Sequence, residues 1–249
     1  MESKEILIFD IKGEFGHFRK YNTTTSPLTY SIPTRTAIAG MLGAIIGAER
    51  EIRDGVFPEG STPVQELFSK STCDIAIQIV QPIKKVNIGF NLVNTKTSFF
   101  DLTRAGRTQI EFELLKDVHY RIYFSSQDST VFKNMTDRII QKRHHFTPYL
   151  GLAQFTATID FYKSATAGKV SVNDIVNIAT AVNMSKIIDR NVRFEKECFY
   201  SVNNMPIEMN AGREVQEYSD VLIEKTGKPV SVKVSEYYQI DGIGNILFL

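Results

Sequence analysis

Side chains suited to holding single-stranded RNA gather between residues 17 and 47. Aromatic rings can stack on bases, and cations can neutralise phosphates. The stretch contains small hydroxyl side chains, the aromatic residues Phe18, Tyr21 and Tyr30, and the cations Arg19, Lys20 and Arg35. A helix expected to start at Pro33 directs its N-terminus towards this loop, where free backbone N–H groups favour anions. The pattern predicts an RNA cradle, and an ordered loop whose rings fill the core is the alternative.

Some of the same residue types could also cleave RNA without a metal, by attack of a 2′-hydroxyl on the neighbouring phosphorus. That reaction needs a general base, a general acid and a cation. The candidates are His17 with Tyr21 or Tyr30, the pair His144 and His145, and Lys116 with His119. Lys116 and His119 are three positions apart, which on a strand sends them to opposite faces. We therefore expect a binding protein, with ribonuclease activity as the alternative.

Other chemistries lack the residues they need. The sequence has no GxxxxGK[ST] phosphate loop, no HExxH, no GxSxG and no acidic cluster spaced for a two-metal nuclease. Cys73 and Cys198 have no Cys or His neighbours, so neither a zinc site nor a disulfide framework is expected. We expect no metal and no cofactor, and a purely protein-binding scaffold stays open as a third function.

The charged residues are unevenly distributed although the net charge is only +1. Residues 15–48 and 138–159 contain no acidic side chain, and residues 81–110 contain only Asp101, while residues 189–225 hold eight acidic and five basic ones. A polyanion is bound largely through Lys and Arg. The distribution therefore predicts a cationic face for RNA and a more acidic face for proteins.

The first part of the chain reads as alternating strands and helices. Residues 6–11 are apolar on both faces, as in a central strand. In the helix that follows Pro33, one stripe is Ile38, Leu42 and Ile45, and another face carries Gly40, Gly43, Ala44 and Gly47. Glycine in a helix costs about 1 kcal/mol, so something is expected to pack closely on that second face.

The elements that follow complete a β-α-β-β-α-β order. The expected elements are strands at 73–80, 118–124 and 155–161, a helix at 128–141, and a hairpin insertion at 84–116 whose return arm is residues 110–114. This order is that of a ferredoxin-like or RRM-like domain. We predict an α+β protein with this domain at residues 1–164, the hairpin included.

Residues 165–249 are expected to form a β-rich C-terminal domain packed on the first. A hairpin is predicted between residues 220–224 and 230–238, and residues 170–184 are ambiguous between strand and helix. The chain begins without a secretory signal pattern. Its longest uncharged apolar stretch, Ala37 to Ala48, has twelve residues, whereas a membrane-spanning helix needs about 20. A cytoplasmic protein without membrane contact is expected.

Three stretches resemble one known family. The order F-R-K, T-T-x-S-P-L-T-Y-S and P-x-R-T-A-I-x-G-x-L-G-A-I-I-G within residues 18–47 is similar to the N-terminal signature of the Cas-five family of CRISPR-associated proteins. Residues 145–152 resemble the T-P-Y-L-G-L loop of that family, and residues 217–222 with 236–238 resemble its C-terminal hairpin. The resemblance extends from residue 6 to about residue 240 and is closest to subunits of type I (I-B-like) Cascade complexes.

The resemblance implies a fold and a task. Such subunits belong to the RAMP superfamily, have a ferredoxin-like core with a hairpin thumb, and cap the five-prime handle of the CRISPR RNA (crRNA). The implied partners are crRNA, the backbone and large subunits of Cascade and, indirectly, target DNA. One branch of the family cuts precursor crRNA with adjacent Lys and His, a pattern that Lys116 and His119 do not match.

The resemblance also implies which residues contact RNA. The thumb would be residues 84–116, where Phe99 or Phe100 could wedge beside a base. Closure of the hairpin by these two rings, or their contact with a protein neighbour, is the alternative. The implied RNA-binding residues are His17, Phe18, Arg19, Lys20, Tyr21, Thr24, Thr25, Ser26, Arg35, Lys96, Arg104, Arg107, His144, His145, Tyr149 and Gly151.

Overall fold

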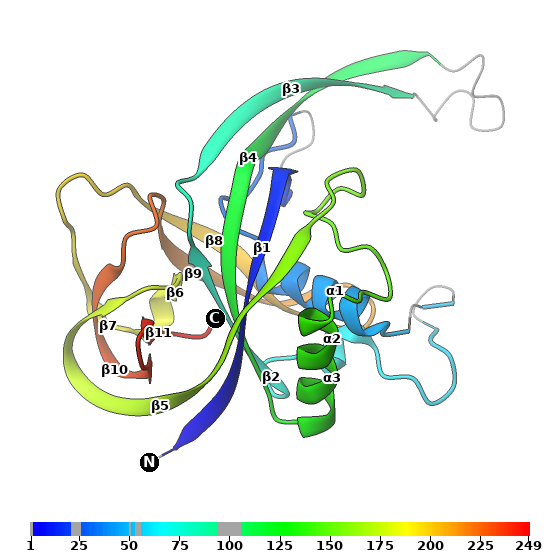
Figure 1. The fold of residues 1–249 in the computed structure, drawn as a ribbon. Coiled ribbons are helices and arrows are strands. Elements are labelled where there is room, and N and C mark those ends of the chain that lie inside the picture. The colour runs from blue at the N-terminus through cyan, green and yellow to red at the C-terminus, as the bar shows by residue number, and fades with distance from the viewer. Residues whose placement is uncertain (1, 21–25, 50, 53–55, 94–105) are drawn as a thin grey trace.

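The computed structural model describes residues 2–20, 26–49, 51–52, 56–93 and 106–249 (Figure 1). The strands are β1 (Ser3–Gly16), β2 (Cys73–Ile79), β3 (Lys84–Val93), β4 (Arg107–Ser126), β5 (Thr158–Ile178), β6 (Val182–Asn183), β7 (Ile187–Arg193), β8 (Tyr200–Met209), β9 (Val215–Glu224), β10 (Val230–Ile240) and β11 (Gly244–Ile246). The helices are α1 (Arg35–Ile46), α2 (Val64–Leu67) and α3 (Ser129–Ile140), with a 3-10 turn at Met184–Lys186. The described chain is therefore mostly β-structure, with few helices.

The larger sheet has eight strands and is built around β1. Its order is β11-β10-β5-β1-β4-β2, with β3 added to β4 and β7 added to β10. Leu7 and Phe9 face α1 and α3, while Ile6 and Ile8 face the C-terminal strands, and all four side chains are fully buried. The central strand expected from the sequence is thus confirmed, because both of its faces are covered.

Helix α1 begins at Arg35, two residues later than the start expected at Pro33, which lies before the N-cap residue. Thr34 caps the N-terminus by accepting a hydrogen bond from the backbone N–H of Ala37. The stripe of Ile38, Leu42 and Ile45 is buried against the sheet. Gly47 ends the helix at φ 79°, a left-handed conformation that glycine adopts without strain. Helix α3, expected at residues 128–141, spans Ser129–Ile140 with Asp128 as its N-cap.

A two-stranded ribbon projects from the body of the molecule (Figure 1). Strand β3 pairs with the first half of β4, from Lys84 opposite Lys116 to Val93 opposite Arg107. Strand β4 is one strand of 20 residues, where the sequence predicted a hairpin arm and a separate strand. Asp117, at φ 51°, is a local irregularity near the base of the ribbon. Strand β4 keeps its register with β1 on both sides of it, as far as Leu115 opposite Gly16, so one strand serves both the sheet and the ribbon.

The predicted hairpin between residues 220–224 and 230–238 is wrong. Strand β9 pairs with β6 and β8 in a separate three-stranded sheet, whereas β10 pairs with β5, β7 and β11 in the larger one. The carboxylate of Glu224 accepts hydrogen bonds from the backbone N–H groups of Thr226 and Lys228. This turn, together with Gly227 at φ 89°, sends the chain from one sheet to the other.

Strand β5 joins the two expected parts of the chain. It begins at Thr158 rather than at residue 155 and runs to Ile178, so the boundary expected between residues 164 and 165 falls inside it. The first half of β5 pairs with β1 and the second half with β10. The ambiguous segment 170–184 is extended up to Asn183. Among the described residues, the structure contains no helix that is long and apolar enough to cross a membrane.

Candidate nucleic-acid interface

Residues 144–151, here called the docking loop, are fixed to the end of α1. The backbone N–H groups of His145 and Phe146 donate to the carbonyls of Ile45 and Ala44, at 3.1 and 2.9 Å. The last carbonyls of a helix have no hydrogen-bond donor within the helix. The docking loop provides two of these donors. A Cβ atom on Gly47 would lie 2.6 Å from Cγ of His145, which makes this contact possible only for glycine.

The other end of the docking loop is locked to β1. The N–H of His17 donates to the carbonyl of Leu150 at 2.9 Å, and the Leu150 side chain is fully buried. Gly151 has φ 89°, and a Cβ atom there would lie 1.8 Å from the carbonyl oxygen of His17. Only glycine allows this approach. Between the two anchors, Tyr149 keeps 45% of its surface exposed.

A groove of about 470 Å³ lies between α1 and the docking loop. Its lining is mostly small or aromatic, and it comprises Ala37, Gly40, Met41, Gly43, Ala44, Ala48, Glu49, Glu51, Phe57, Val64, Gln65, Phe146, Thr147, Pro148, Tyr149, Gly151 and Arg213. The expected close packing on the glycine face of α1 is confirmed at Gly43, where a Cβ would lie 2.8 Å from Cγ2 of Val64, and at Gly47. Gly40 differs, because no atom lies within 4 Å of its Cβ position.

Polar groups also line the groove. Glu51 pairs with Arg213 of the β8–β9 turn, with 2.8 Å between Oε1 and Nη2. Glu49 also lines the groove and is exposed. The Oε1 atom of Gln65 is buried and has no hydrogen-bond partner among the described residues. No sequence pattern marks these residues, although the run of small side chains on α1 points to this face.

Two aromatic rings predicted to contact RNA lie in the core instead. Phe18 and Tyr30 are 4% and 5% exposed. The Tyr30 hydroxyl donates to the carbonyl of Asn204 at 2.8 Å, and burial raises its pKa. These two rings fit the alternative expected from the sequence, an ordered loop whose rings fill the core. Both lie in an apolar environment, and the Tyr30 hydroxyl is bonded within the protein. Tyr21, Thr24 and Thr25 lie outside the described residues.

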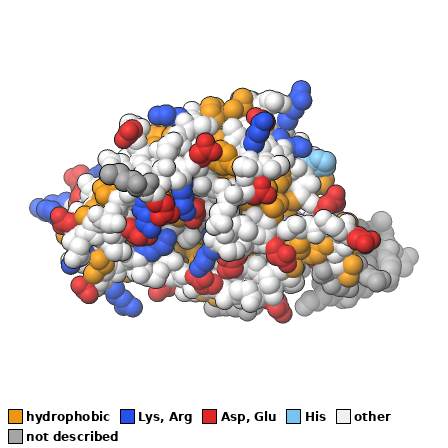
Figure 2. Space-filling view, turned by 90° about the horizontal axis from the view of Figure 1, so that it is seen from below, with side chains coloured by type: hydrophobic (Ala, Val, Ile, Leu, Met, Phe, Trp, Pro, Cys, Tyr) orange, Lys and Arg blue, Asp and Glu red, His pale blue; other side chains and the backbone are white. Residues whose placement is uncertain are grey.

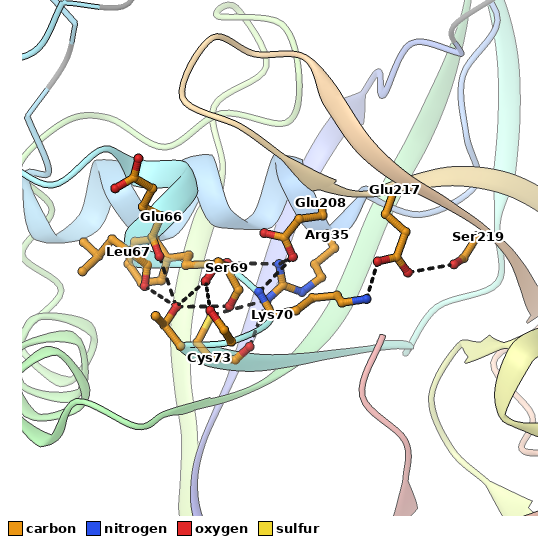
Figure 3. Close-up of polar contacts among 12 residues, drawn as sticks. Arg35, Glu66, Leu67, Ser69, Lys70, Cys73, Glu208, Glu217 and Ser219 are labelled. Carbon is orange, nitrogen blue, oxygen red and sulfur yellow. Dashed lines mark hydrogen bonds and ion pairs between the residues drawn. The ribbon is translucent and has the colours of Figure 1, made fainter.

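Arg35 was predicted to line the RNA site and lies in the interior. Its side chain is 2% exposed, and Figure 3 shows it between α1 and the chain that leads into β2. Nη1 donates to the carbonyl of Phe68 at 3.0 Å, and Nη2 donates to the carbonyl of Cys73 at 2.9 Å. Glu208 approaches to 4.0 Å. The guanidinium group therefore joins three parts of the fold and does not face solvent.

His17 is also buried, at 2% exposure, at the base of the ribbon. Its Nδ1 lies 2.9 Å from the carbonyl oxygen of Glu113, and its ring meets the edge of Phe112 at 5.3 Å. Burial lowers the pKa of this imidazole, and its Nε2 has no partner among the described residues. The neutral form is therefore favoured. His144, in the docking loop, is half-buried, and burial lowers its pKa as well.

The remaining predicted RNA contacts lie nearer the surface. Arg19, Ser26, Arg107 and His145 are exposed. Lys20 is half-buried, with Nζ 3.4 Å from Oδ1 of Asn203 and 5.7 Å from the centre of the Tyr30 ring. The structure groups His144, His145, Tyr149 and Gly151 in the docking loop and places Arg107 on the separate ribbon. Lys96, Phe99, Phe100 and Arg104 lie outside the described residues.

The candidate cleavage groups are held in other contacts. Lys116 and His119 are separated by the irregularity at Asp117. Nε2 of His119 lies 2.9 Å from Oδ2 of Asp10, which also binds Arg121. Burial opposes ionisation of Asp10, but hydrogen bonds from Arg121 and His119 outweigh it and lower the pKa of Asp10. Within the described ranges, no group of three or more His, Cys, Asp or Glu residues could hold a metal ion.

The expected separation of charge is not visible on the face drawn in Figure 2. There, Lys and Arg side chains alternate with Asp and Glu. From the cationic windows, Lys85 pairs with Glu113 and Lys142 pairs with Asp160, and Glu217 of the acidic window pairs with Lys70. Part of the charge in each of these windows is thus neutralised by residues outside it.

Comparison with known proteins gives a family and a fold. A family model described as CRISPR-associated protein (Cas_Cas5) matches residues 6–219. No curated protein matches the chain. A chain of the assembly named "CRISPR RNA-guided surveillance complex" has 10% identity and a TM-score of 0.52, with 92% of this chain and 91% of that chain covered.

Two further solved structures share the fold. A CRISPR protein from Archaeoglobus fulgidus has 11% identity and a TM-score of 0.52, with coverage of 98% and 99%. A chain of the Type III-B Cmr-beta complex bound to cognate target RNA and AMPPnP has 14% identity and a TM-score of 0.50, with coverage of 92% and 86%. At these identities the likeness shows the fold alone.

Proposed function

Because the chain belongs to the Cas-five family of CRISPR-associated proteins, we propose that it is an RNA-binding subunit of a type I (I-B-like) CRISPR surveillance complex. In this proposal it caps the five-prime handle of the crRNA and contacts the backbone and large subunits in the cytoplasm. Target DNA is reached only indirectly. The order β5-β1-β4-β2, with α1 and α3 on one face, supports a ferredoxin-like core for this task.

The observation that carries the proposal is the docking loop. It presents Tyr149, an exposed ring, at the edge of a groove, and the exposed cations Lys142 and Arg143 precede the loop in the chain. Stacking on an aromatic ring contributes about 1 to 3 kcal/mol per base, and nearby cations add phosphate contacts. Rigid anchors at both ends keep the ring in place when no RNA is bound.

The RNA-contact set is narrower than the one expected from sequence. Arg35, Phe18 and His17 form the frame that holds the surface and are not proposed as contacts. The proposed contacts among the described residues are Arg19, Lys20, Ser26, Arg107, His145 and Tyr149.

We assign the ribbon of β3 and β4 as the thumb. One face of it carries Ile88, Leu92, Phe90 and Phe112 by cross-strand register, and Ile88 and Leu92 are 36% and 38% exposed. A two-stranded ribbon in water is only marginally stable by itself. An apolar face on such a ribbon suits contact with a protein neighbour, here the backbone subunit.

We propose that the protein binds RNA without cleaving it. Of the histidines considered for catalysis, His17 is buried and His119 is paired with Asp10, while His144 is half-buried and His145 is exposed in the docking loop. Incubation of the purified protein with CRISPR repeat RNA in the presence of EDTA tests this directly. A single site-specific cut would replace the binding role with that of a processing ribonuclease.

Two experiments test RNA binding itself. Purification of the protein from its own cells, with sequencing of the RNA that accompanies it, is expected to recover crRNA. Replacement of Arg19 and Lys20 by Ala should weaken binding of repeat-derived RNA and reduce the salt slope of log K by about one for each phosphate that is no longer neutralised. Lys133→Ala, on the exposed side of α3, is the matched control. Unchanged binding in the double variant would favour a protein scaffold.

A further inference from the structure

We propose that the groove between α1 and the docking loop holds one unstacked RNA base and accepts hydrogen bonds from an amino group on the edge of that base. The inference rests on the RNA-binding function proposed above and adds a position and a base preference to it. The groove volume of about 470 Å³ lies within the usual range for small-molecule sites, about 300 to 1,000 Å³.

The shape of the groove depends on Gly40. This residue faces the groove from the middle of an otherwise well-formed helix, where glycine is unfavourable. Packing accounts for its neighbours on the same face, because Gly43 contacts Val64 and Gly47 contacts His145. Gly40 has nothing within 4 Å of its Cβ position and is exposed. A side chain at this position would fill space that the fold leaves open. Gly40 therefore forms the floor of the groove and leaves room for a ligand above it.

Flat side chains border this floor. Phe57, Phe146 and Tyr149 line the groove, and Phe146 and Tyr149 are 42% and 45% exposed. Large rings at the surface of a protein are costly to leave in water, and unpaired bases are commonly held by stacking on such rings. The walls therefore suit a planar aromatic ligand better than a bulky aliphatic one.

The polar groups of the groove select for a hydrogen-bond donor. Gln65 lines the groove, and its Oε1 is buried without a partner among the described residues, which is unfavourable. A rotation of this side chain towards the groove would give the oxygen a donor on the ligand. The carboxylates of Glu49 and Glu51 line the same groove. Adenine, cytosine and guanine have an exocyclic amino group, whereas uracil has two carbonyls and one ring N–H. The groove should therefore disfavour uracil.

The same carboxylates indicate how a nucleotide would lie. They repel a phosphate, so only the base is expected to enter the groove. Arg143 and His145 are exposed, precede Phe146 in the chain and lie outside the groove lining, whereas the nearby Lys142 pairs with Asp160. Arg143 and His145 can donate hydrogen bonds to the phosphates on either side of the inserted base. A nucleotide, with donors at one end and negative charge at the other, matches both regions.

The main test is a variant, Gly40→Leu, whose new side chain occupies the groove. Gly40→Leu should fold at least as well as the wild type, because leucine is a far better helix former and meets no atom at its Cβ position. Binding of fluorescent single-stranded oligo(A), oligo(C) and oligo(U) is measured by anisotropy. The wild type should bind oligo(A) and oligo(C) about tenfold more tightly than oligo(U). Gly40→Leu should lose that preference and bind all three with the weaker affinity.

A second variant tests the acceptor alone. Gln65→Leu keeps a similar side-chain volume and removes an oxygen that has no partner within the described chain. It should lower the affinity for oligo(A) and oligo(C) about tenfold and leave that for oligo(U) unchanged. Equal base preferences in Gln65→Leu and the wild type would show that the amide does not read the base, and would overturn the inference.

The outcomes separate this inference from the proposed function. If no oligonucleotide and no repeat RNA binds the wild type, RNA binding itself fails. If RNA binds the wild type and Gly40→Leu alike, and the variant instead no longer assembles with a protein subunit, the groove receives a protein side chain such as arginine. That result would leave the RNA-binding role intact and reject the base site.

Discussion

The segment 17–35 and the docking loop contain similar residue types and use them in opposite ways. In the first, Phe18, Tyr30 and Arg35 are turned into the core, where they join α1, β2 and β8. In the docking loop, the backbone and Leu150 provide the anchors, and Tyr149 remains at the surface. Rings and cations in an RNA-binding pattern can therefore build the frame or carry the contact, and the partners of their polar atoms distinguish the two.

Arg35 shows why the frame can use a cation. A buried guanidinium is strongly unfavourable unless carbonyls or carboxylates accept its hydrogen bonds. Phe68 and Cys73 provide two carbonyls, and Glu208 lies 4.0 Å away. The carbonyls belong to the chain segment between α2 and the start of β2. Arg35 thus completes the hydrogen bonding of the link between these two elements.

The largest effect should come from removing Arg35. Arg35→Ala leaves two buried carbonyls without donors and opens a cavity, so the free energy of unfolding should fall by about 3 kcal/mol or more. Urea unfolding followed by circular dichroism measures this. Arg19→Ala, at an exposed site, should change stability by less than about 0.5 kcal/mol. If the two variants are equally stable, Arg35 does not hold the frame and the comparison between the two segments fails.

Gly151→Ala should have the next largest effect, because it breaks an anchor of the docking loop. A Cβ atom at φ 89° is strained and would lie 1.8 Å from the His17 carbonyl oxygen. The free energy of unfolding should fall by about 2 kcal/mol. Gly60→Ala, also at positive φ but with nothing within 4 Å of its Cβ position, is the control that isolates the steric contact from the backbone strain. An equal loss in both variants would assign the effect to φ alone.

Local patterns allowed much of the fold to be predicted. The stripe of Ile38, Leu42 and Ile45 in α1 and the alternation in β2 each depend on neighbours within a few residues. Such periodicities reflect which face of an element is buried, so they place β1, α1, β2 and α3 correctly.

Partners far apart in the sequence could not be predicted in the same way. Arg35 bonds residues 33 and 38 positions away, and nothing in the local pattern indicates that those carbonyls need a donor. The turn after β9 has the composition of a hairpin, but the hydrogen bonds of Glu224 send β10 to another sheet. For the candidate site, Tyr149 and Gly151 followed from resemblance to the family, whereas Gln65 and Phe57 join the groove only through tertiary packing.

Tyr149 is the exposed ring of the docking loop, in contrast to the buried rings of segment 17–35. Tyr149→Ala should weaken binding of repeat-derived RNA about tenfold, or by about 1.4 kcal/mol, because the ring no longer stacks on a base. Stability should stay within about 0.5 kcal/mol of the wild type, because the side chain is 45% exposed. Tyr149→Phe keeps the ring and should retain most of the affinity in the same anisotropy titration. A loss as large in Tyr149→Phe as in Tyr149→Ala would assign the contact to the hydroxyl rather than to stacking.

The smallest expected effect is a pH dependence of the free energy of unfolding that arises from His17, the buried histidine of the first segment. Burial lowers the folded-state pKa of His17 below 6.5, so the unfolded chain binds more protons as the pH falls from about 7 to 5, and stability should decrease over that window. Asp10, Asp160 and Glu113 have lowered pKa values, so their contributions are lost only at more acidic pH. His17→Gln can still donate to the Glu113 carbonyl and does not titrate there, so urea unfolding at pH 7 and pH 5 should show a smaller difference for this variant. The opposite outcome is that His17→Gln leaves the stability difference between pH 7 and pH 5 unchanged, while His144→Gln reduces it. The titrating group would then be His144 of the docking loop, and the first segment would not be distinguished by a buried titrating histidine.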